Sequence, residues 1–265
     1  MDPLAPLITA LHSEGRLRVW SMIITVFGDL IQHRGGEAST TRLGRLLGRV
    51  EVEQGALRTA LSRLGRDGWV HSERSGRTSL YRLSAQGLNQ FAPATKRIYA
   101  PPRSTPVARW AIALQLGSSG RFEATLSPAD EVTGGADCLV TGALEQVSDT
   151  YRAALLSPAH RAALEGLAAD LQGLVLPLPT ALDAAAARML LIHRWRRLVL
   201  RFPDIPADLM PVDTPLADPR RAVAELYAQL VPAAEAWLEG DSPGLPPMPT
   251  ALRPAAHRFT KAHRG

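Results

Sequence analysis

The chain has 265 residues, of which 46% are hydrophobic and 21% charged, and a formal net charge of +5. This composition excludes an intrinsically disordered chain, and the single cysteine, Cys138, excludes a disulfide framework and a thiol-rich metal site. The length predicts two or three domains with a buried core. Residues 1–100 hold 14 Lys and Arg against 8 Asp and Glu, whereas the remainder holds 16 against 17, so the positive excess is N-terminal. Neither a leader pattern nor an apolar run of about 18 residues is present, and we expect a cytoplasmic protein without a membrane span.

The first 50 residues predict a short arm followed by two helices. Residues 1–14 are poorly patterned and are interpreted as the arm. Apolar residues then recur at helical spacing over 17–31, across an arc so wide that this helix should be buried. Residues 39–41, Ser-Thr-Thr, are candidate caps of a second helix. One side of that helix is apolar, and the other is basic and either contacts phosphate or faces solvent, with Arg42, Arg45 and Arg49.

The third predicted helix has an inward and an outward face. At about 100° per residue, Leu57, Ala60, Leu61 and Leu64 fall together and should be buried. The opposite face is small and basic, which suits the floor of a DNA major groove, although Arg63 has an alternative partner in Asp67 at i+4. The candidate DNA contacts on this helix, on the second helix and on the ribbon that follows are Gln54, Gly55, Arg58, Thr59, Ser62, Arg63, Arg66, Arg42, Arg45, Arg74 and Arg77.

A two-stranded ribbon is predicted directly after the third helix. Residues 69–74 and 78–83 flank a Ser-Gly-Arg turn at 75–77, and Tyr81 alternates with Leu83 onto one face. Three helices followed by a ribbon are the layout of a winged helix-turn-helix, which we assign to residues 15–98.

Three runs in this region carry a resemblance to a known family. They are Phe27-Gly28-Asp29, then residues 57–64 with Gly68-Trp69, and residues 76–83, GRTSLYRL. At this spacing they resemble the N-terminal domain of the PaaX family, which are transcriptional repressors of phenylacetate catabolism. The resemblance implies a small ferredoxin-like α/β domain behind the DNA-binding domain.

The rest of the chain is predicted to be an α/β segment followed by helices. A helix over 85–99 and a proline-rich linker over 99–106 lead to a middle domain at 107–150, a trimmed ferredoxin-like form with strands at 107–116 and about 138–141. Residues 151–242 predict a helical effector-binding and dimerisation domain, with helices from Pro158, from Ala181 to about Arg201, and from Pro219. The tail, 243–265, is expected to be loosely ordered.

The helical domain carries a second resemblance to the same family. It rests on residues 191–197, LIHRWRR, on Pro203-Asp-Ile-Pro206 and on Leu209-Met-Pro211, while Trp195, Phe202 and residues 214–216 depart from the family pattern. The family implies an aryl-CoA effector, typically phenylacetyl-CoA, and the departures leave its identity open. Candidate effector contacts are His193, Trp195, Arg196, Arg197 and Arg201. The alternative is an arginine-rich helix that bridges acidic residues of neighbouring helices in a dimer interface.

Together these patterns predict a mainly α, α+β protein that acts as a homodimeric DNA-binding repressor of an aromatic-acid catabolic operon. An aryl-CoA thioester would release it from a palindromic double-stranded operator. No catalytic, metal or cofactor site is predicted, because none of the usual hydrolase or metal motifs occurs. The alternatives are a winged-helix module for protein–protein assembly and a CoA-thioester hydrolase.

Overall fold

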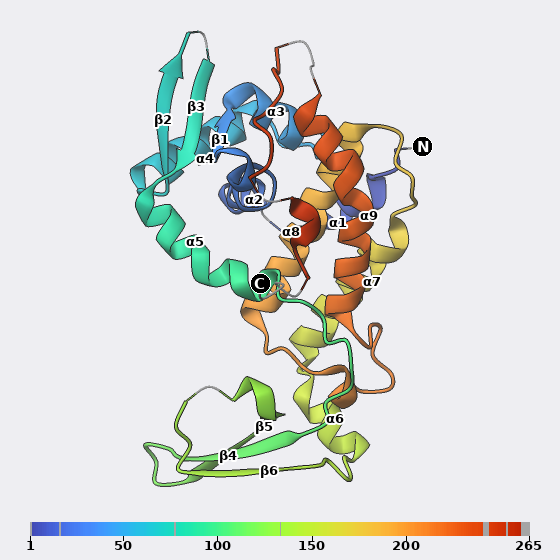
Figure 1. Ribbon diagram of the computed structural model, residues 1–265. Helices are drawn as coiled ribbons and strands as arrows, with labels where there is room; N and C mark the ends of the chain where they lie inside the picture. Colours follow the sequence, from blue (N-terminus) through green and yellow to red (C-terminus); the bar gives the residue numbers. More distant parts are fainter. Residues whose placement is uncertain are drawn as a thin grey trace.

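The structure is a computed structural model that describes residues 2–15, 17–76, 78–132, 134–240, 244–252 and 254–260. It combines α-helices with two three-stranded antiparallel sheets, which agrees with the predicted α+β class. Figure 1 shows the two sheets at opposite ends of the molecule, with most helices between them. None of the described helices is both long and apolar enough to cross a membrane.

The N-terminal unit begins with helix α2 (Val19–Val26), which continues into a π-helical turn (Phe27–Ile31) and a 3₁₀ turn (Gln32–Arg34). Gly35, with φ of 86°, ends this run in a conformation that favours glycine. The unit continues through the short strand β1 and two helices to a hairpin, with sheet order β1-β3-β2: β1 (Glu37–Ser39), α3 (Thr40–Gly48), α4 (Gln54–Arg66), β2 (Val70–Ser75) and β3 (Thr78–Leu83).

Two helices flank this unit. The Ser84 hydroxyl caps α5 (Ala85–Ile98), which lies close to the predicted range. Residues 1–14, predicted to be an arm, contain α1 (Ala5–Ser13) instead, and this helix packs on α7 (Pro158–Gly173). Leu7, Ile8 and Leu11 are buried there, so the apparent lack of pattern concealed a short amphipathic helix.

The middle unit is a sheet in the order β5-β4-β6, formed by β4 (Trp110–Leu116), β5 (Phe122–Pro128) and β6 (Cys138–Gly142). The prediction found β4 and β6 and missed β5. The signal for β5 is present, because apolar and polar residues alternate along Phe122–Ser127. A 3₁₀ turn (Ala129–Glu131) follows β5.

The C-terminal unit is helical, as predicted, with α6 (Asp149–Leu155), α7, α8 (Ala181–Arg201), the 3₁₀ turn Ala207–Leu209, and α9 (Pro219–Glu239). Side chains of Ser157, Thr180 and Asp218 cap α7, α8 and α9. Helix α8 is central, since 14 of its 21 residues are buried. Four consecutive alanines, Ala184–Ala187, permit close approach of the helices around it.

The described part of the tail is packed, which corrects the expectation of a loose segment. The backbone of Leu252 donates to the His33 carbonyl at 2.8 Å, and that of Met248 donates to the Leu238 carbonyl at 2.9 Å. Leu245, Met248 and Phe259 are buried. Residues 244–252 and 254–260 therefore connect the N-terminal unit to α9, and we call them the C-terminal segment.

Candidate nucleic-acid interface

Helix α4 has the two faces that its sequence predicted. Leu57, Ala60, Leu61 and Leu64 are buried against the unit, where α4 contacts α2. The predicted outward residues are all exposed: Gln54, Gly55, Arg58, Thr59, Ser62, Arg63 and Arg66. Asp67 and Gly68, the latter with φ of 73°, end the helix and lead into the hairpin. Helix α4 thus presents a surface of small and basic side chains to solvent.

A hollow of about 690 Å³ lies beside the first turns of α4. Helix α3 and strand β3 form its other walls, and the Thr40 hydroxyl donates to the Ser79 carbonyl at 3.1 Å between them. Its lining is rich in hydroxyl, amide and guanidinium groups, and the described lining residues include no Asp or Glu: Thr40, Thr41, Gly44, Arg45, Gln54, Arg58, Thr78, Ser79 and Tyr81. Such a lining suits an anion that carries several acceptor oxygens.

The remaining predicted contacts occupy different environments. Arg63 pairs with Asp67 at 3.5 Å, which is the alternative that the sequence left open, yet its side chain is 63% exposed. The Thr59 hydroxyl donates to the Gly55 carbonyl of its own helix at 3.0 Å. Arg74 is exposed on β2 and lies near the turn, where it donates to the Gly76 carbonyl. Arg77, the predicted tip of the ribbon, lies outside the described residues.

The prediction that Arg42 contacts DNA is wrong for this structure. Its side chain is buried, donates to the Pro246 carbonyl and stacks over Trp237, 5.3 Å from the ring centroid. The C-terminal segment covers this part of α3. Burial accordingly lowers the pKa of the Arg42 guanidinium, and the nearby Arg45 and Arg34 charges add to that effect. Arg45, one turn further along, remains exposed.

The five predicted effector contacts on α8 do not converge on one cavity. Trp195 donates through its indole nitrogen to the Ile98 carbonyl at 2.8 Å, whereas Arg196 donates to the Ser21 carbonyl at 2.9 Å on α2. Arg197 pairs with Glu14 at 2.7 Å. Their helical spacing is as predicted, but α8 is surrounded by other elements, and these side chains are divided between α2, the end of α5 and the end of α1. Trp195, Arg196 and Arg197 thus connect α8 to other parts of the same chain. The guanidinium of Arg201 lies over the ring of the neighbouring Phe202.

His193 faces α2, where its Nδ1 lies 3.1 Å from the Thr25 hydroxyl. Burial, together with the positive charges of Arg196, Arg197 and Arg194, lowers the pKa of His193 from 6.5 to about 3. The side chain is therefore neutral in the folded protein at neutral pH, and it serves as a packing and hydrogen-bonding group between α8 and α2.

A pH dependence of stability follows from His193. Its pKa is lower in the folded than in the unfolded state, so between pH 6.5 and 3 the unfolded state binds more protons. The stability that His193 contributes is present above pH 6.5 and is lost as the pH falls, by roughly 2 kcal/mol at pH 5. Urea unfolding at pH 7 and pH 5 should show a smaller difference for His193→Gln than for the unchanged chain. The matched control is His71→Gln at an exposed site, and equal differences for all three proteins would contradict the assignment.

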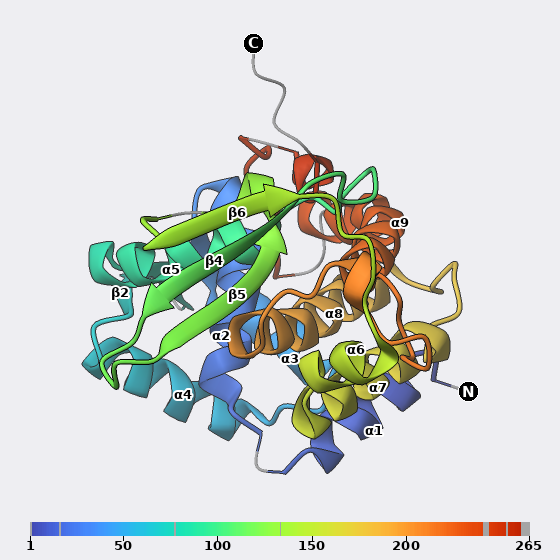
Figure 2. The ribbon, with the colours of Figure 1, turned by 90° about the horizontal axis from the view of Figure 1, so that it is seen from below.

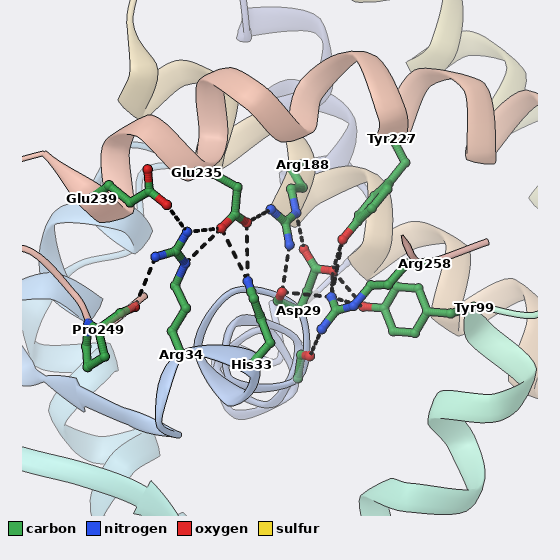
Figure 3. A network of polar contacts seen from close by, with 11 residues as sticks. Asp29, His33, Arg34, Tyr99, Arg188, Tyr227, Glu235, Glu239, Pro249 and Arg258 are labelled. Carbon is green, nitrogen blue, oxygen red and sulfur yellow. Dashed lines mark hydrogen bonds and ion pairs between the residues drawn. The ribbon is translucent and has the colours of Figure 1, made fainter. Parts of the chain in front are cut away.

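A buried polar network joins the N-terminal unit to the C-terminal unit and the C-terminal segment (Figure 3). Its centre is Asp29, whose fully buried carboxylate accepts from Arg188 Nε at 2.7 Å, from Tyr99 at 2.7 Å and from Tyr227 at 2.9 Å. Arg258 of the C-terminal segment also contacts this carboxylate, and it donates to the Asp29 carbonyl at 2.7 Å. Burial would raise the pKa of Asp29, but the guanidinium groups of Arg188 and Arg258 reverse this and hold it below its usual value.

The second half of the network surrounds Glu235 on α9. Its carboxylate accepts from Arg34 Nε at 2.8 Å and contacts Arg188 and His33. Burial would raise the pKa of Glu235, and hydrogen bonds from His33 and the arginines lower it well below its usual range. Arg34 also pairs with Glu239. Three arginines thus face three carboxylates, so the described network is balanced in charge.

Two family models match the chain over separate ranges. The model described as PaaX-like protein matches residues 18–87, which span the surface built from α3, α4 and the hairpin. The model described as PaaX-like protein C-terminal domain matches residues 143–240, which contain α6 to α9. Among curated proteins, the transcriptional repressor PaaX of Escherichia coli strain K12 is 28% identical over 262 residues, and the match covers 82% of each chain. Together the two matched ranges span well over half of the sequence, and the chain belongs to the PaaX family.

Proposed function

We propose that this protein is a transcriptional repressor that binds double-stranded DNA through a winged helix-turn-helix formed by α2 to β3. The observation that carries the proposal is the exposed face of α4, which is small and basic and has the hydroxyl-lined hollow beside it. A helix of this kind enters the major groove, where Arg58 is placed to read a base edge. Membership of the PaaX family supports the same function, since the E. coli relative carries the name of a repressor.

The hollow beside α4 would hold the DNA backbone while α4 reads the bases. Its hydroxyl groups come from α3 and β3, and Arg45 adds an exposed cation at its wall. Phosphate contacts of this type fix the register of the protein on the duplex without reading sequence. Arg74 on the hairpin extends the basic surface beyond the hollow.

Substitution of Arg58 by alanine should weaken operator binding by about 1–3 kcal/mol if the side chain reads a base. Gel-shift titrations with DNA from upstream of the protein's own gene neighbourhood measure this, at several salt concentrations. The matched control is Arg161→Ala on α7, which removes the same charge far from α4. Binding should also fall steeply with salt, because phosphate contacts release counterions. Equal affinities for the two variants, or binding insensitive to salt, would contradict DNA recognition by this face.

The same titration separates the rival functions. A winged helix used for protein–protein assembly would show neither the steep salt dependence nor the effect of Arg58→Ala. A CoA-thioester hydrolase would release free CoA catalytically from phenylacetyl-CoA. The family relation favours the repressor over both alternatives.

The resemblance supports finer proposals about regulation. We infer that the repressor acts on an aromatic-acid catabolic operon with a palindromic operator, and that an aryl-CoA thioester releases it. Ligand must then bind the DNA-incompetent arrangement more tightly than the competent one. Such a repressor would work in the compartment that holds the operator, which the sequence predicts to be the cytoplasm.

We place the contact of a homodimer on the middle sheet rather than within residues 151–242. In the sheet register Ile112 lies between Leu126 and Val140, Leu114 lies beside Cys138, and Leu116 pairs with Phe122. One face is therefore apolar throughout, and Ile112, Leu116, Phe122 and Val140 are between 46% and 64% exposed. An apolar face of this kind marks an interaction site. A palindromic operator requires a second copy of this chain, which would cover it.

The dimer proposal predicts that Ile112→Glu, in the central strand, yields a monomer. Two copies would then bury carboxylates in an apolar contact, which should weaken association by several kcal/mol. The control is Leu139→Glu, because Leu139 is 50% exposed but points to the opposite face, with Ala113. Sedimentation equilibrium should find a dimer for the control and a monomer for Ile112→Glu. A dimer in both would place the contact elsewhere.

A further inference from the structure

A hollow of about 510 Å³ lies where the three parts of the molecule meet. Its wall consists of linker residues 100, 101 and 103–106, the loop 204–208, and the start of α9 with its cap Asp218. Glu131 of the middle unit completes the wall. We call it the junction hollow. Its volume lies within the range of small-molecule sites.

Arg220 is the cation held most firmly in this wall. Its guanidinium stacks 5.1 Å from the Trp195 ring and donates to the carbonyls of Arg97 at 3.0 Å and Ala100 at 3.2 Å. The remaining amino group pairs with Asp204. The Arg220 side chain is 10% exposed, whereas that of Asp204 is 58% exposed. The arginine is therefore fixed, and the carboxylate is free to turn away when another acceptor arrives.

Part of the wall of the hollow is apolar and can contact an aryl ring. Pro101, Pro106 and Pro206 line it together with Ile205. Ile205 and Asp204 also border a small crevice of about 20 Å³ beside α8, which is otherwise lined by these residues: His160, Trp195, Leu198, Val199, Pro203, Met210 and Pro219. Nδ1 of the buried His160 has no hydrogen-bond partner in the described residues. An apolar group of a ligand in the junction hollow would lie beside the side chains of this crevice and could pack against them.

The charge of the lining limits what else can bind. Among the described lining residues, three arginines, at 103, 220 and 221, stand against four carboxylates, at 131, 204, 208 and 218. This balance is unfavourable for a polyphosphate, which needs an excess of cations. The same balance of charge permits a ligand with one hydrogen-bond acceptor group, which would replace the Asp204 carboxylate on Arg220. The nucleotide part of a CoA thioester would have to lie outside the hollow.

We propose that the junction hollow binds the acyl end of an aromatic effector, with its carboxylate or carbonyl oxygen on Arg220. This inference rests on the proposed function. It locates the effector in the junction hollow and not at the α8 residues that the sequence suggested. The position suits control of DNA binding, because Arg220 donates to the carbonyl of Arg97, in the last turn of α5, and to that of Ala100 just beyond this helix. Trp195 bonds the same helix end through Ile98, and Arg97 donates to the Val199 carbonyl at 2.7 Å. A ligand that repositions Arg220 therefore acts on the helix that follows the hairpin.

Isothermal titration of the full chain with phenylacetate, phenylacetyl-CoA and CoA, in the absence of DNA, tests the site. Ala207→Trp fills the hollow from an exposed position and should weaken the aryl ligand by about thirtyfold, since the apolar contacts of the ligand are lost. Ala162→Trp on α7 is exposed and outside the hollow, and should leave the affinity unchanged.

A second substitution distinguishes the two sources of the aryl group. Asp204→Asn removes the competitor for Arg220 and should tighten phenylacetate binding by about two- to fivefold, with little effect on the uncharged thioester. Asp213→Asn, at another exposed ion pair, is its control. The proposal is supported if the binding of either phenylacetate or phenylacetyl-CoA is weakened by Ala207→Trp. No aryl binding, binding indifferent to Ala207→Trp, or CoA alone binding as tightly as its thioester would overturn it. Gel shifts without ligand judge the repressor function separately, because Ala207→Trp should leave them unchanged.

Discussion

Substitution of Asp29 by asparagine is expected to lower the free energy of unfolding by about 3–5 kcal/mol. Asparagine keeps the shape of the side chain but leaves Arg188 and Arg258 without the carboxylate that both contact. Arg188 is fully buried, and among the described residues Glu235 is the one anionic partner that it retains. A buried cation that loses its partner carries most of its desolvation penalty uncompensated, and this effect exceeds the loss of the hydrogen bonds themselves.

Urea unfolding monitored by far-ultraviolet circular dichroism measures this difference. Asp213→Asn is the matched control, because Asp213 is 78% exposed and pairs with Arg161 at 3.2 Å. The control should change stability by less than about 1 kcal/mol. A loss below that value for Asp29→Asn as well would show that the network around Asp29 adds little to stability.

The network also predicts how substitutions combine. Arg258→Gln should destabilise the chain by itself, but it should add much less in the presence of Asp29→Asn, since the carboxylate that it contacts is already gone. Simple addition of the two effects would mean that Arg258 acts through its other partners, the carbonyls of Gly28 and Asp29 and the hydroxyls of Tyr99 and Tyr227.

The surface of α4 could be predicted from sequence because its pattern is local. The inward and outward residues of a helix follow from one period of 3.6, and the hairpin follows from a period of two with a turn between. Arg42 was misassigned because its environment depends on residues that are distant in the sequence. Its helix does have a basic face, but Pro246 and Trp237, which lie about 200 residues away in the chain, cover part of it. Local periodicity carries no information about such cover.

The network had one signal in the sequence, and its partners had none. Asp29 lies in a run that the pattern predicted to be buried, and a buried carboxylate requires cations. Its partner Arg188 is 159 residues away, and Arg258 is 229 residues away. On α8 the spacing of His193, Arg196 and Arg197 was read correctly, but their neighbours α1 and α2 come from the start of the chain. These long-range pairings are set by packing around α8.

The C-terminal segment carries the second large prediction: a chain that ends after residue 253 should lose about 3–5 kcal/mol of stability. The truncation removes the Phe259 side chain, which is buried between the rings of Tyr99 and Tyr227 at 5.3 Å from each, and this burial contributes about 2–3 kcal/mol. It also removes Arg258 from Asp29, which adds about 1.5–3 kcal/mol.

Strain reduces the loss on truncation slightly, because Phe259 has φ of 61°, a conformation that favours glycine and costs about 1 kcal/mol or more. The packing of its ring must outweigh that strain for the conformation to persist. A chain that ends after Thr260 is the matched control, since it keeps both Arg258 and Phe259 and should unfold at the same urea concentration as the full chain. If the shorter truncation product matched that control, the C-terminal segment would not hold the N-terminal unit to α9. A large loss confined to the shorter product would mean that residues beyond both family matches determine how firmly the N-terminal unit, which carries α4, is attached.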